Sequence, residues 1–585
     1  MTAWLRTRVD NYKQKTPMNR ISKLLAICCI AVLLAGCGSE EAEQTREEVI
    51  KQVNATGILT DKQAETLGNS KVLSPRLNGL TEITDEQAKS LSRAKKNLTL
   101  DGLTSISDKQ AESLGKANGI SLNSLTSITD QQAESLGKAK GLQLNSLTSI
   151  TDQQAESLSK ARQLLLRGLI SITDEQAKSL SKVTGYLDLT GLTSITDLQA
   201  ENLSNVETLY LNGLTSITDE QAKSLSKVAG YLYLNGLTEI TAEQARALCK
   251  HEQLRISDIC HEQLLSYQQK TIDKINVSGI ITDEQVEILR NFKGDKFDLS
   301  GLLDLSGLAS ITDDQVNRLS KHSSLKLDGL KSITDEQTKI LSNVETLSLN
   351  GLTAITDEQA QSLSKVMHLS LGLTSITDQQ AEILSNVEYG LSLSGVTNIT
   401  NEQAAILSKI MYLQLNGLTS ITTKQAQILS NTSALFLDGL TSITDEQAES
   451  LCRYDGYLSL GGLTSITDQQ AESLSKARQL LLSGLISITD EQAKRLSKVT
   501  GYLDLTGLTE ITDEQAESLN KVGALYLNGL TSITDDQAEI LSKIKFLSLN
   551  GLTSITDEQA RSLSNVRLLE TSEDLQPLID KYKKQ

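Results

Sequence analysis

A repeat of about 22 residues returns along nearly the whole chain, and it constrains the fold more than any single residue does. A clear copy lies around residues 210–230 and follows the pattern Leu-x-Leu, Gly-Leu, Ile-Thr-Asp-x-Gln-Ala-x-x-Leu. Repeats in this size range build solenoids, in which each repeat packs mainly on its two neighbours. The chain is therefore expected to form an extended array rather than one compact core.

Each repeat combines a strand pattern with a helix pattern. The leucines on either side of Tyr210 alternate with it, which predicts a short strand with the leucines in the core and Tyr210 on the opposite face. Thr218 and Gln221 have the spacing of a capping box, so a helix is expected to begin there. Ala222, Leu225 and Val228 continue at spacings of three and predict an apolar stripe on a helix of about three turns.

A strand followed by a helix in every repeat makes consecutive strands parallel, with the helices on the outer surface. The sequence thus predicts an α/β solenoid with parallel strands on the concave face and short helices on the convex face. A single repeat buries too few apolar side chains to offset its loss of conformational entropy. Stability must come from stacking between repeats and from polar caps at the ends.

These residues give the repeat its resemblance to the leucine-rich repeat, in the type whose unit ends in Ile-Thr-Asp before a helix. The resemblance covers about nine tenths of the chain. It implies a parallel-stranded horseshoe used for protein recognition, with no catalytic residues to carry over. Leucine stands where that pattern has Cys or Asn, so the side-chain ladder that ties up turn amides in the family is expected to be absent. Examples are Leu103, Leu214, Leu352 and Leu530.

The start of the chain has the pattern of a bacterial lipoprotein signal peptide, predicted over residues 1–36. Arg20 and Lys23 precede an apolar run over 24–35, which is too short to cross a bilayer core, and Cys37 follows Leu-Ala-Gly. Cys37 is then the lipidated residue, and Met18 offers a second candidate start. Gly-Ser after the cysteine favours the outer membrane of a bacterial envelope. Residues 37–52 would form the tether and the N-terminal cap.

The chain has a second start in its middle. Residues 53–61 resemble residues 275–283, and both stretches follow a polar, helical-looking segment. We therefore predict a first solenoid arm over 53–265, a second over 266–566 and a C-terminal cap over 567–585. The repeat at the join is irregular, with Cys260 at the position usually held by the capping Thr.

The same join gathers Cys249, His251, Cys260 and His261. Their spacing matches no usual zinc-finger pattern, and substitution within the repeat explains them, so no metal is expected. A disulfide between Cys249 and Cys260 is the alternative for an oxidising compartment. No cofactor is expected either, because no nucleophilic triad, phosphate loop or carboxylate pair stands outside the repeat.

Charge and duplication bear on the kind of partner. The formal net charge is −17 and no basic stripe occurs, which disfavours nucleic acid. Residues 148–193 and 464–509 are identical except for Arg167 against Ser483 and Ser179 against Arg495. Growth by block duplication suits a modular surface better than an enzyme, so no catalytic activity is expected.

The strand positions that face outward carry the candidate binding residues. Many are serine, which predicts a surface of low relief, namely Ser121, Ser348, Ser370, Ser392, Ser459 and Ser548. Aromatic residues interrupt them in runs over successive repeats, and each run is expected to form a contiguous strip on the concave face. The aromatic residues are Tyr186, Tyr210, Tyr231, Tyr233, Tyr412, Phe436, Tyr457, Tyr502, Tyr526 and Phe546. They are either interface anchors or strand-favouring residues that simply pack on one another.

The sequence therefore predicts a lipid-anchored envelope protein that binds a macromolecule on its concave face. A protein is the favoured partner, and a glycan is the other partner that tyrosine strips suit. The alternative is a structural spacer or surface-layer component, in which length matters and no specific ligand exists.

Overall fold

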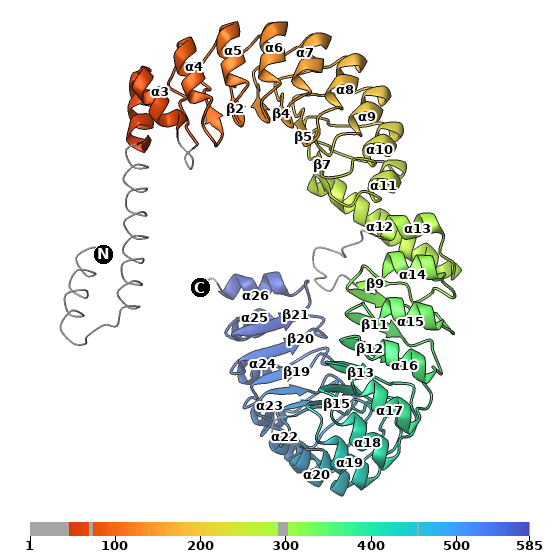
Figure 1. The fold of residues 1–585 in the computed structure, drawn as a ribbon. Coiled ribbons are helices and arrows are strands. Elements are labelled where there is room, and N and C mark those ends of the chain that lie inside the picture. The colour runs from red at the N-terminus through yellow and green to blue at the C-terminus, as the bar shows by residue number, and fades with distance from the viewer. Residues whose placement is uncertain (1–45, 70–73, 291–301, 453–455, 584–585) are drawn as a thin grey trace, which may run out of the picture. The chain divides into compact units, whose positions relative to one another are not determined.

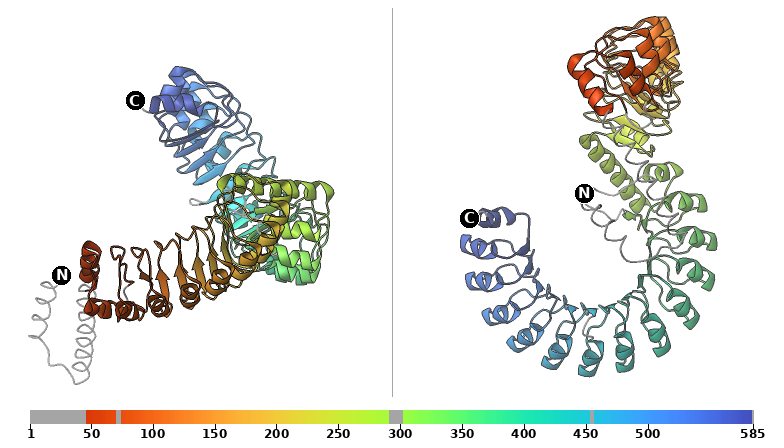
Figure 2. Two further views of the ribbon diagram at one scale, coloured as in Figure 1. Left: turned by 90° about the horizontal axis from the view of Figure 1, so that it is seen from above. Right: turned by 60° about the vertical axis from the view of Figure 1, so that its left-hand side comes forward.

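The computed structural model describes residues 46–69, 74–290, 302–452 and 456–583. The chain divides into two compact units, Met1–Tyr267 and Gln268–Gln585. Each unit is an α/β solenoid, as predicted, with parallel strands along the inner side and helices along the outer side (Figure 1). The arrangement is clearest for the second unit, whose helices fan outward around the strands (Figure 2).

The first unit opens with a helix over 46–56 and then alternates helices and strands. Its elements are α3 (Asp61–Gly68), α4 (Asp85–Leu91), β1 (Leu98–Thr99), α5 (Asp108–Leu114), β2 (Gly119–Ser121), α6 (Asp130–Leu136), β3 (Gly141–Gln143), α7 (Asp152–Leu158), β4 (Gln163–Leu165), α8 (Asp174–Leu180), β5 (Tyr186–Asp188), α9 (Asp197–Leu203), β6 (Thr208–Tyr210), α10 (Asp219–Leu225), β7 (Leu232–Leu234), α11 (Ala242–Leu248) and β8 (Leu254–Ile256).

A long helix, α12 (Asp258–Ser278), contains the boundary between the units. The second unit continues with α13 (Asp283–Leu289), β9 (Leu302–Asp304), α14 (Asp313–Leu319), β10 (Ser324–Lys326), α15 (Asp335–Leu341), β11 (Thr346–Leu349), α16 (Asp357–Leu363), β12 (His368–Leu371), α17 (Asp378–Leu384), β13 (Gly390–Ser392), α18 (Asn401–Leu407), β14 (Tyr412–Gln414), α19 (Thr423–Leu429), β15 (Ala434–Phe436), α20 (Asp445–Leu451), β16 (Tyr457–Ser459), α21 (Asp468–Leu474), β17 (Gln479–Leu481), α22 (Asp490–Leu496), β18 (Tyr502–Asp504), α23 (Asp513–Leu519), β19 (Ala524–Tyr526), α24 (Asp535–Leu541), β20 (Phe546–Leu549), α25 (Asp557–Leu563), β21 (Leu568–Thr571) and α26 (Gln576–Lys583).

In the part of the chain that the structure describes, the strands form one parallel sheet in each unit, with 8 strands in the first and 13 in the second, and sequential strands are neighbours. The register sets equivalent residues side by side, so that Leu187, Leu209 and Leu232 form one line. These leucines are completely buried. Leu214 and Ile217 also face inward, as the pattern predicts. The core of each unit is therefore a continuous apolar spine.

The helices begin where predicted but are shorter. Every predicted capping residue except Cys260 caps a helix, and Thr218 and Gln221 form the expected capping box at α10. However, α10 has 7 residues, about two turns, rather than three. Val228 is buried beyond the helix end, in a turn where its N–H donates to the carbonyl of Leu225 (3.1 Å). A spacing of three fits such a turn as well as it fits a helix.

The capping glutamine also links neighbouring repeats. While Gln221 Oε1 accepts the N–H of Thr218 (2.9 Å), its Nε2 donates to the carbonyl of Ile195 in the preceding repeat (2.8 Å). The Thr218 hydroxyl donates to Asp197 of that same preceding repeat (2.7 Å). The glutamine bond recurs in both units. The threonine, aspartate and glutamine that recur in each repeat thus stabilise the contact between neighbouring repeats as well as the start of the individual helix.

A side-chain ladder is present, but it does not lie at the Cys or Asn position of the family pattern, where the expected leucine is buried. Asn123 and Asn145 follow the second strand leucine of their repeats. The side-chain oxygen of Asn123 accepts the N–H of Asn145 (3.1 Å), and that of Asn145 accepts the N–H of Arg167 (3.3 Å). Asn528 does the same for Asn550 in the second unit (2.9 Å). The ladder has moved toward the strand, which leaves the usual Asn position to a buried leucine.

The two units begin in the same way. Gly57 and Gly279 end the helix over 46–56 and α12, and both adopt positive φ (69° and 70°), which favours glycine. One turn earlier, Asn54 accepts the N–H of Gly79 (2.9 Å), and Asn276 accepts the N–H of Gly307 (2.8 Å). Each unit therefore starts on a helix whose asparagine joins the first turn of the stack. At the far end, α26 packs on α25 where a capping helix is predicted.

Cys260 does not hold the capping position assigned to it. The hydroxyl of Ser257 lies at the start of α12, where it accepts the N–H of Cys260 (3.4 Å) and donates to the carbonyl of Leu237 (2.6 Å). Cys260 and His261 lie within the first turn of α12. The irregular repeat keeps its strand, β8, but its short turn and helix are replaced by a helix of 21 residues.

Candidate functional site

Two outward residues on each strand build the face opposite the helices. One precedes the buried strand leucine and one follows it, and we call these positions row one and row two. In β5, Tyr186 lies in row one and Asp188 in row two, on either side of Leu187. Because the strands are in register, each row runs across the whole sheet of its unit.

The aromatic residues of the first unit form a contiguous strip over β5, β6 and β7. Tyr210 and Tyr233 stack with ring centroids 4.0 Å apart and planes only 6° from parallel. Tyr186 meets Tyr210 edge-on at 6.1 Å, and Tyr231 lies 6.0 Å from Tyr233. The predicted run is thus one cluster of rings rather than four separate side chains.

The second unit carries two such clusters. In the first, Phe436 lies 4.8 Å from Tyr412 and 5.0 Å from Tyr457, over β14, β15 and β16. Phe436 is only 9% exposed, so it supports the tyrosines rather than offering a surface of its own. Phe436 was predicted to contact the ligand; in the structure it instead packs beneath Tyr412 and Tyr457 and supports their rings.

The other cluster of the second unit lies over β18, β19 and β20. There, Tyr526 lies 4.3 Å from Tyr502 and 5.1 Å from Phe546. Strand β17, which carries Gln479 and Leu481 on its outward side, separates the two clusters. Together, the two clusters place aromatic rings on six of the seven strands from β14 to β20.

The rings are accessible yet partly desolvated. Tyr231 and Tyr412 are 41% and 40% exposed, and the other tyrosines of the strips are half-buried. Burial raises the pKa of Tyr457 to about 12, with further contributions from Tyr412 and Asp504. Burial and the neighbouring Tyr233 hydroxyl raise the pKa of Tyr210 to about 12 as well. Tyr210 and Tyr457 are therefore neutral phenols at physiological pH.

The outward serines do not form the plain, low-relief surface that the sequence predicts. Ser459 donates to Asp438 (2.5 Å), and Ser548 donates to Asn528 (2.8 Å). Ser548 is completely buried beneath its neighbours. These serines belong to the ladder of side-chain hydrogen bonds, so part of the predicted outward surface is structural.

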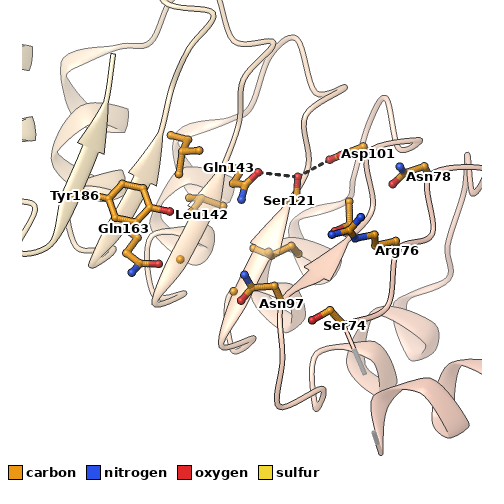
Figure 3. Close-up of a pocket in the computed structure, with 15 residues that line it drawn as sticks. Ser74, Arg76, Asn78, Asn97, Asp101, Ser121, Leu142, Gln143, Gln163 and Tyr186 are labelled. Carbon is orange, nitrogen blue, oxygen red and sulfur yellow. Dashed lines mark hydrogen bonds between the residues drawn. The ribbon is translucent and has the colours of Figure 1, made fainter. Parts of the chain in front are cut away.

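Among the described residues, the strand face of each unit has a hollow that the sequence analysis did not predict. The larger, of about 350 Å³, lies over β1 to β5 in the first unit (Figure 3). The smaller, of about 220 Å³, lies beside Ser370, Gly390 and Tyr412 in the second unit. Both contain glycine at row one. Aligning row one across successive repeats would have shown where side chains are missing.

At the join, Cys249 follows the last residue of α11, and Cys260 and His261 lie in the first turn of α12. Cys249 and Cys260 are buried, and the structure holds both as thiols without the bond that the sequence allows between them. Burial raises the pKa of Cys249 to about 12 and lowers the pKa of His251. The described residues contain no group of three or more His, Cys, Asp or Glu side chains that could hold a metal ion.

Cys37, the predicted lipidation site, lies outside the described residues. Among the helices that are described, none is long and apolar enough to span a membrane.

No family model matches the chain, and no curated protein matches it. Among solved structures, an internalin from Listeria monocytogenes is similar, with 18% sequence identity over 53% of this chain and 88% of that chain, at a TM-score of 0.29. The solenoid architecture itself rests on the parallel strand register and the repeated capping boxes of this chain.

Proposed function

We propose that this chain is a binding scaffold that recognises a protein partner through the aromatic strips on its strand faces. The observation that carries the proposal is the two ring clusters of the second unit, over β14 to β16 and β18 to β20, whose tyrosines are partly exposed. Tyrosine suits interfaces because it offers a large apolar ring and a hydroxyl at low entropic cost. Rings that are needed only for the core would lie between the leucines, not on the opposite face.

The surroundings of the rings fit an interface. The carboxylates of Asp438 and Asp504 lie next to the clusters in the second unit, and both residues are half-buried. A partly apolar centre with a polar rim is the usual composition of a protein-binding patch. The acidic rim favours a partner segment that carries basic side chains.

Serine substitutions in the strips test this function. Tyr502→Ser, Tyr526→Ser and Phe546→Ser together should abolish co-purification of a discrete partner from cells that make the protein. The matching set for the first unit is Tyr210→Ser, Tyr231→Ser and Tyr233→Ser. The far-ultraviolet circular dichroism should stay unchanged, because the core leucines are intact.

A control variant has the same number of serines on the helix side, at Glu134, Glu156 and Glu201, which are exposed. It should retain the partner. Undiminished binding by both aromatic variants would reject the strips as the site.

We further propose that the scaffold belongs to a bacterial envelope and is anchored to the outer membrane by a lipid on Cys37. The support is the sequence of residues 18–37, with its basic start, apolar run and small residues before the cysteine. Metabolic labelling with a fatty acid should mark the wild type and be lost in Cys37→Ser. Equal labelling of both would remove the anchor from the proposal.

The alternative, a spacer without a specific ligand, is favoured by the nearly identical blocks 148–193 and 464–509, which show that the array has lengthened by duplication. Deleting whole repeats separates the two functions. A spacer loses function gradually with length, whereas a binder fails only when its strip is removed.

A further inference from the structure

The larger hollow of the first unit differs from the strips in chemistry. Its volume of about 350 Å³ falls in the range of small-molecule sites, roughly 300–1,000 Å³. Its lining is mainly polar and comes from five successive strands, with Arg76 and Asn97 at one end and Gln163 and Tyr186 at the other (Figure 3). We call this site the polar hollow.

Two adjacent glycines line the hollow. Gly119 and Gly141 are partners in register at row one of β2 and β3. The Asn97 side chain lies against Gly119, where a Cβ would come within 2.3 Å of Asn97 Oδ1, so the open space is the one above Gly141. Neither glycine has positive φ, so backbone conformation does not require glycine at either position. A Cβ on Gly141 would come only within 3.4 Å of Gln163 Oε1 and 3.7 Å of the Gly119 Cα, which are ordinary contacts. Packing therefore does not require the open space above Gly141.

The polar groups around this space have hydrogen-bonding capacity to spare. In the described part of the chain, the side-chain amides of Asn97 and Gln163 and the guanidinium of Arg76 make no hydrogen bond. Gln143 uses only its oxygen, which accepts from Ser121 (3.4 Å). An amide offers two donors and one acceptor, so it can serve both roles of a hydroxyl group at once. The groups converge from different strands on one volume.

One wall of the hollow is aromatic. Tyr186 is half-buried, and its hydroxyl points toward the hollow (Figure 3). The two charged residues of the lining, Arg76 and Asp101, have opposite signs. Asp101 is already engaged, because it accepts hydrogen bonds from Ser121 (2.6 Å) and from the N–H of Asn123 (2.9 Å). The site therefore offers neutral amides, one cation and one ring.

We propose that the polar hollow is a saccharide-binding subsite for a neutral sugar. Adjacent hydroxyls of a pyranose match the donor and acceptor groups of the side-chain amides. The apolar C–H face of the sugar ring can pack on the phenol ring of Tyr186. A phosphorylated ligand fits poorly, since Arg76 is the one cation among the lining residues that the structure describes. An apolar ligand would leave the amides unpaired at a cost. The subsite shares Tyr186 with the strip of the first unit, but it contains none of the rings of the second unit that carry the proposed function.

The duplicated block provides a matched control. Gln479 occupies the same place in β17 that Gln163 occupies in β4, within nearly identical sequence. However, the strand before Gln479 carries Tyr457 at row one, where the strand before Gln163 carries Gly141. The same glutamine therefore borders a hollow in one unit and an aromatic ring in the other.

The test is a printed array of neutral oligosaccharides, followed by titration calorimetry of the full chain with the strongest binder. We expect Gln163→Ala to weaken binding about 10-fold, the loss of one or two hydrogen bonds. Gly141→Val should weaken sugar binding at least as much, because the valine side chain fills the hollow. Valine also favours a strand, so the backbone should keep its conformation. Gln479→Ala should bind like the wild type.

Circular dichroism verifies that each variant is folded, and Gly141→Ala replaces Gly141→Val if the latter is not. No binding of any neutral sugar by the wild type would overturn the proposal, as would equal affinity in the Gly141 variant or a preference for anionic sugars. The variant with serine at Tyr502, Tyr526 and Phe546 should keep the sugar and lose the protein partner, so the two proposals can fail independently.

Discussion

Residues 148–193 and 464–509 are two copies of one sequence block placed in different surroundings. Both fold into the same elements, with a strand at Gln163–Leu165 or Gln479–Leu481 and a second at Tyr186–Asp188 or Tyr502–Asp504. On their outward sides, one copy borders the polar hollow and the other joins two aromatic clusters. The repeat sequence sets local structure, whereas neighbouring repeats decide what each face can bind.

The two substitutions between the copies each add an ion pair, but on opposite sides of the solenoid. Arg167 lies on the strand side, where its Nε is 2.6 Å from Asp188, a residue only 2% exposed. Arg495 lies on the helix side and pairs with Glu491 (2.8 Å) and Glu472 (3.4 Å). Only the change at Arg167 alters a candidate binding face.

The largest expected effect is one that both copies share. Gln176→Ala and Gln492→Ala each remove the bond to the capping threonine and a bond of 2.8 Å to a carbonyl in the preceding repeat. Because the partner groups are left unsatisfied, we expect each to lower the free energy of unfolding by about 2–4 kcal/mol. Urea denaturation checks this. Costs that differ by more than about 1 kcal/mol would show that the copies are not structurally equivalent.

A smaller effect should distinguish the copies. Arg167→Ser gives the first copy the residue of the second and leaves the buried Asp188 with the N–H and hydroxyl of Thr190 as its remaining partners. We expect a loss of about 1–2 kcal/mol, because the arginine itself is half exposed. The reference is Ser179→Arg, on the helix side, which should change stability by less than about 1 kcal/mol. Similar values for both would show that the buried pair adds no stability.

The smallest effect concerns alkaline pH. The folded-state pKa of Tyr210 and of Tyr457 is about 12, above the ordinary value of 10.0. The folded state thus keeps protons that the unfolded state loses, so unfolding free energy should fall as pH rises from about 10 to about 12. Tyr210→Phe and Tyr457→Phe should each remove part of this fall. Urea denaturation at several pH values measures the fall in unfolding free energy, and the absorbance of tyrosinate during a pH titration measures the ionisation of the two tyrosines. Ionisation of both residues near pH 10 would contradict the desolvation of the strips.

Much of the fold could be predicted from the sequence because the repeat aligns its leucines by itself. The strand β6 (Thr208–Tyr210), the capping box at Thr218 and the outward position of Tyr210 follow from local patterns. Helix length was wrong, since Val228 satisfies a helical spacing although it lies in a turn. Cys260 was misplaced because the pattern of the repeat was extended into α12.

The features that were not predicted depend on contacts between repeats. Gln221 and Asn123 look like capping and turn residues within one repeat, and their second partners appear only when repeats are stacked. The polar hollow depends on Gly119 and Gly141 being adjacent across two strands. The aromatic strips could be predicted because each aromatic residue can be recognised in the sequence of its own repeat. The hollow could not, because it arises where side chains are absent on neighbouring strands.

The central claim is that the strand face, and not the helix face, recognises a partner. Site-specific photo-crosslinking in cells that make the protein tests it directly, with the reactive residue placed at Tyr526 on β19 or at the exposed Glu539 on α24. We predict a discrete protein adduct from position 526 and none from position 539. Adducts of equal yield at both positions, or an adduct at position 539 alone, would contradict the account.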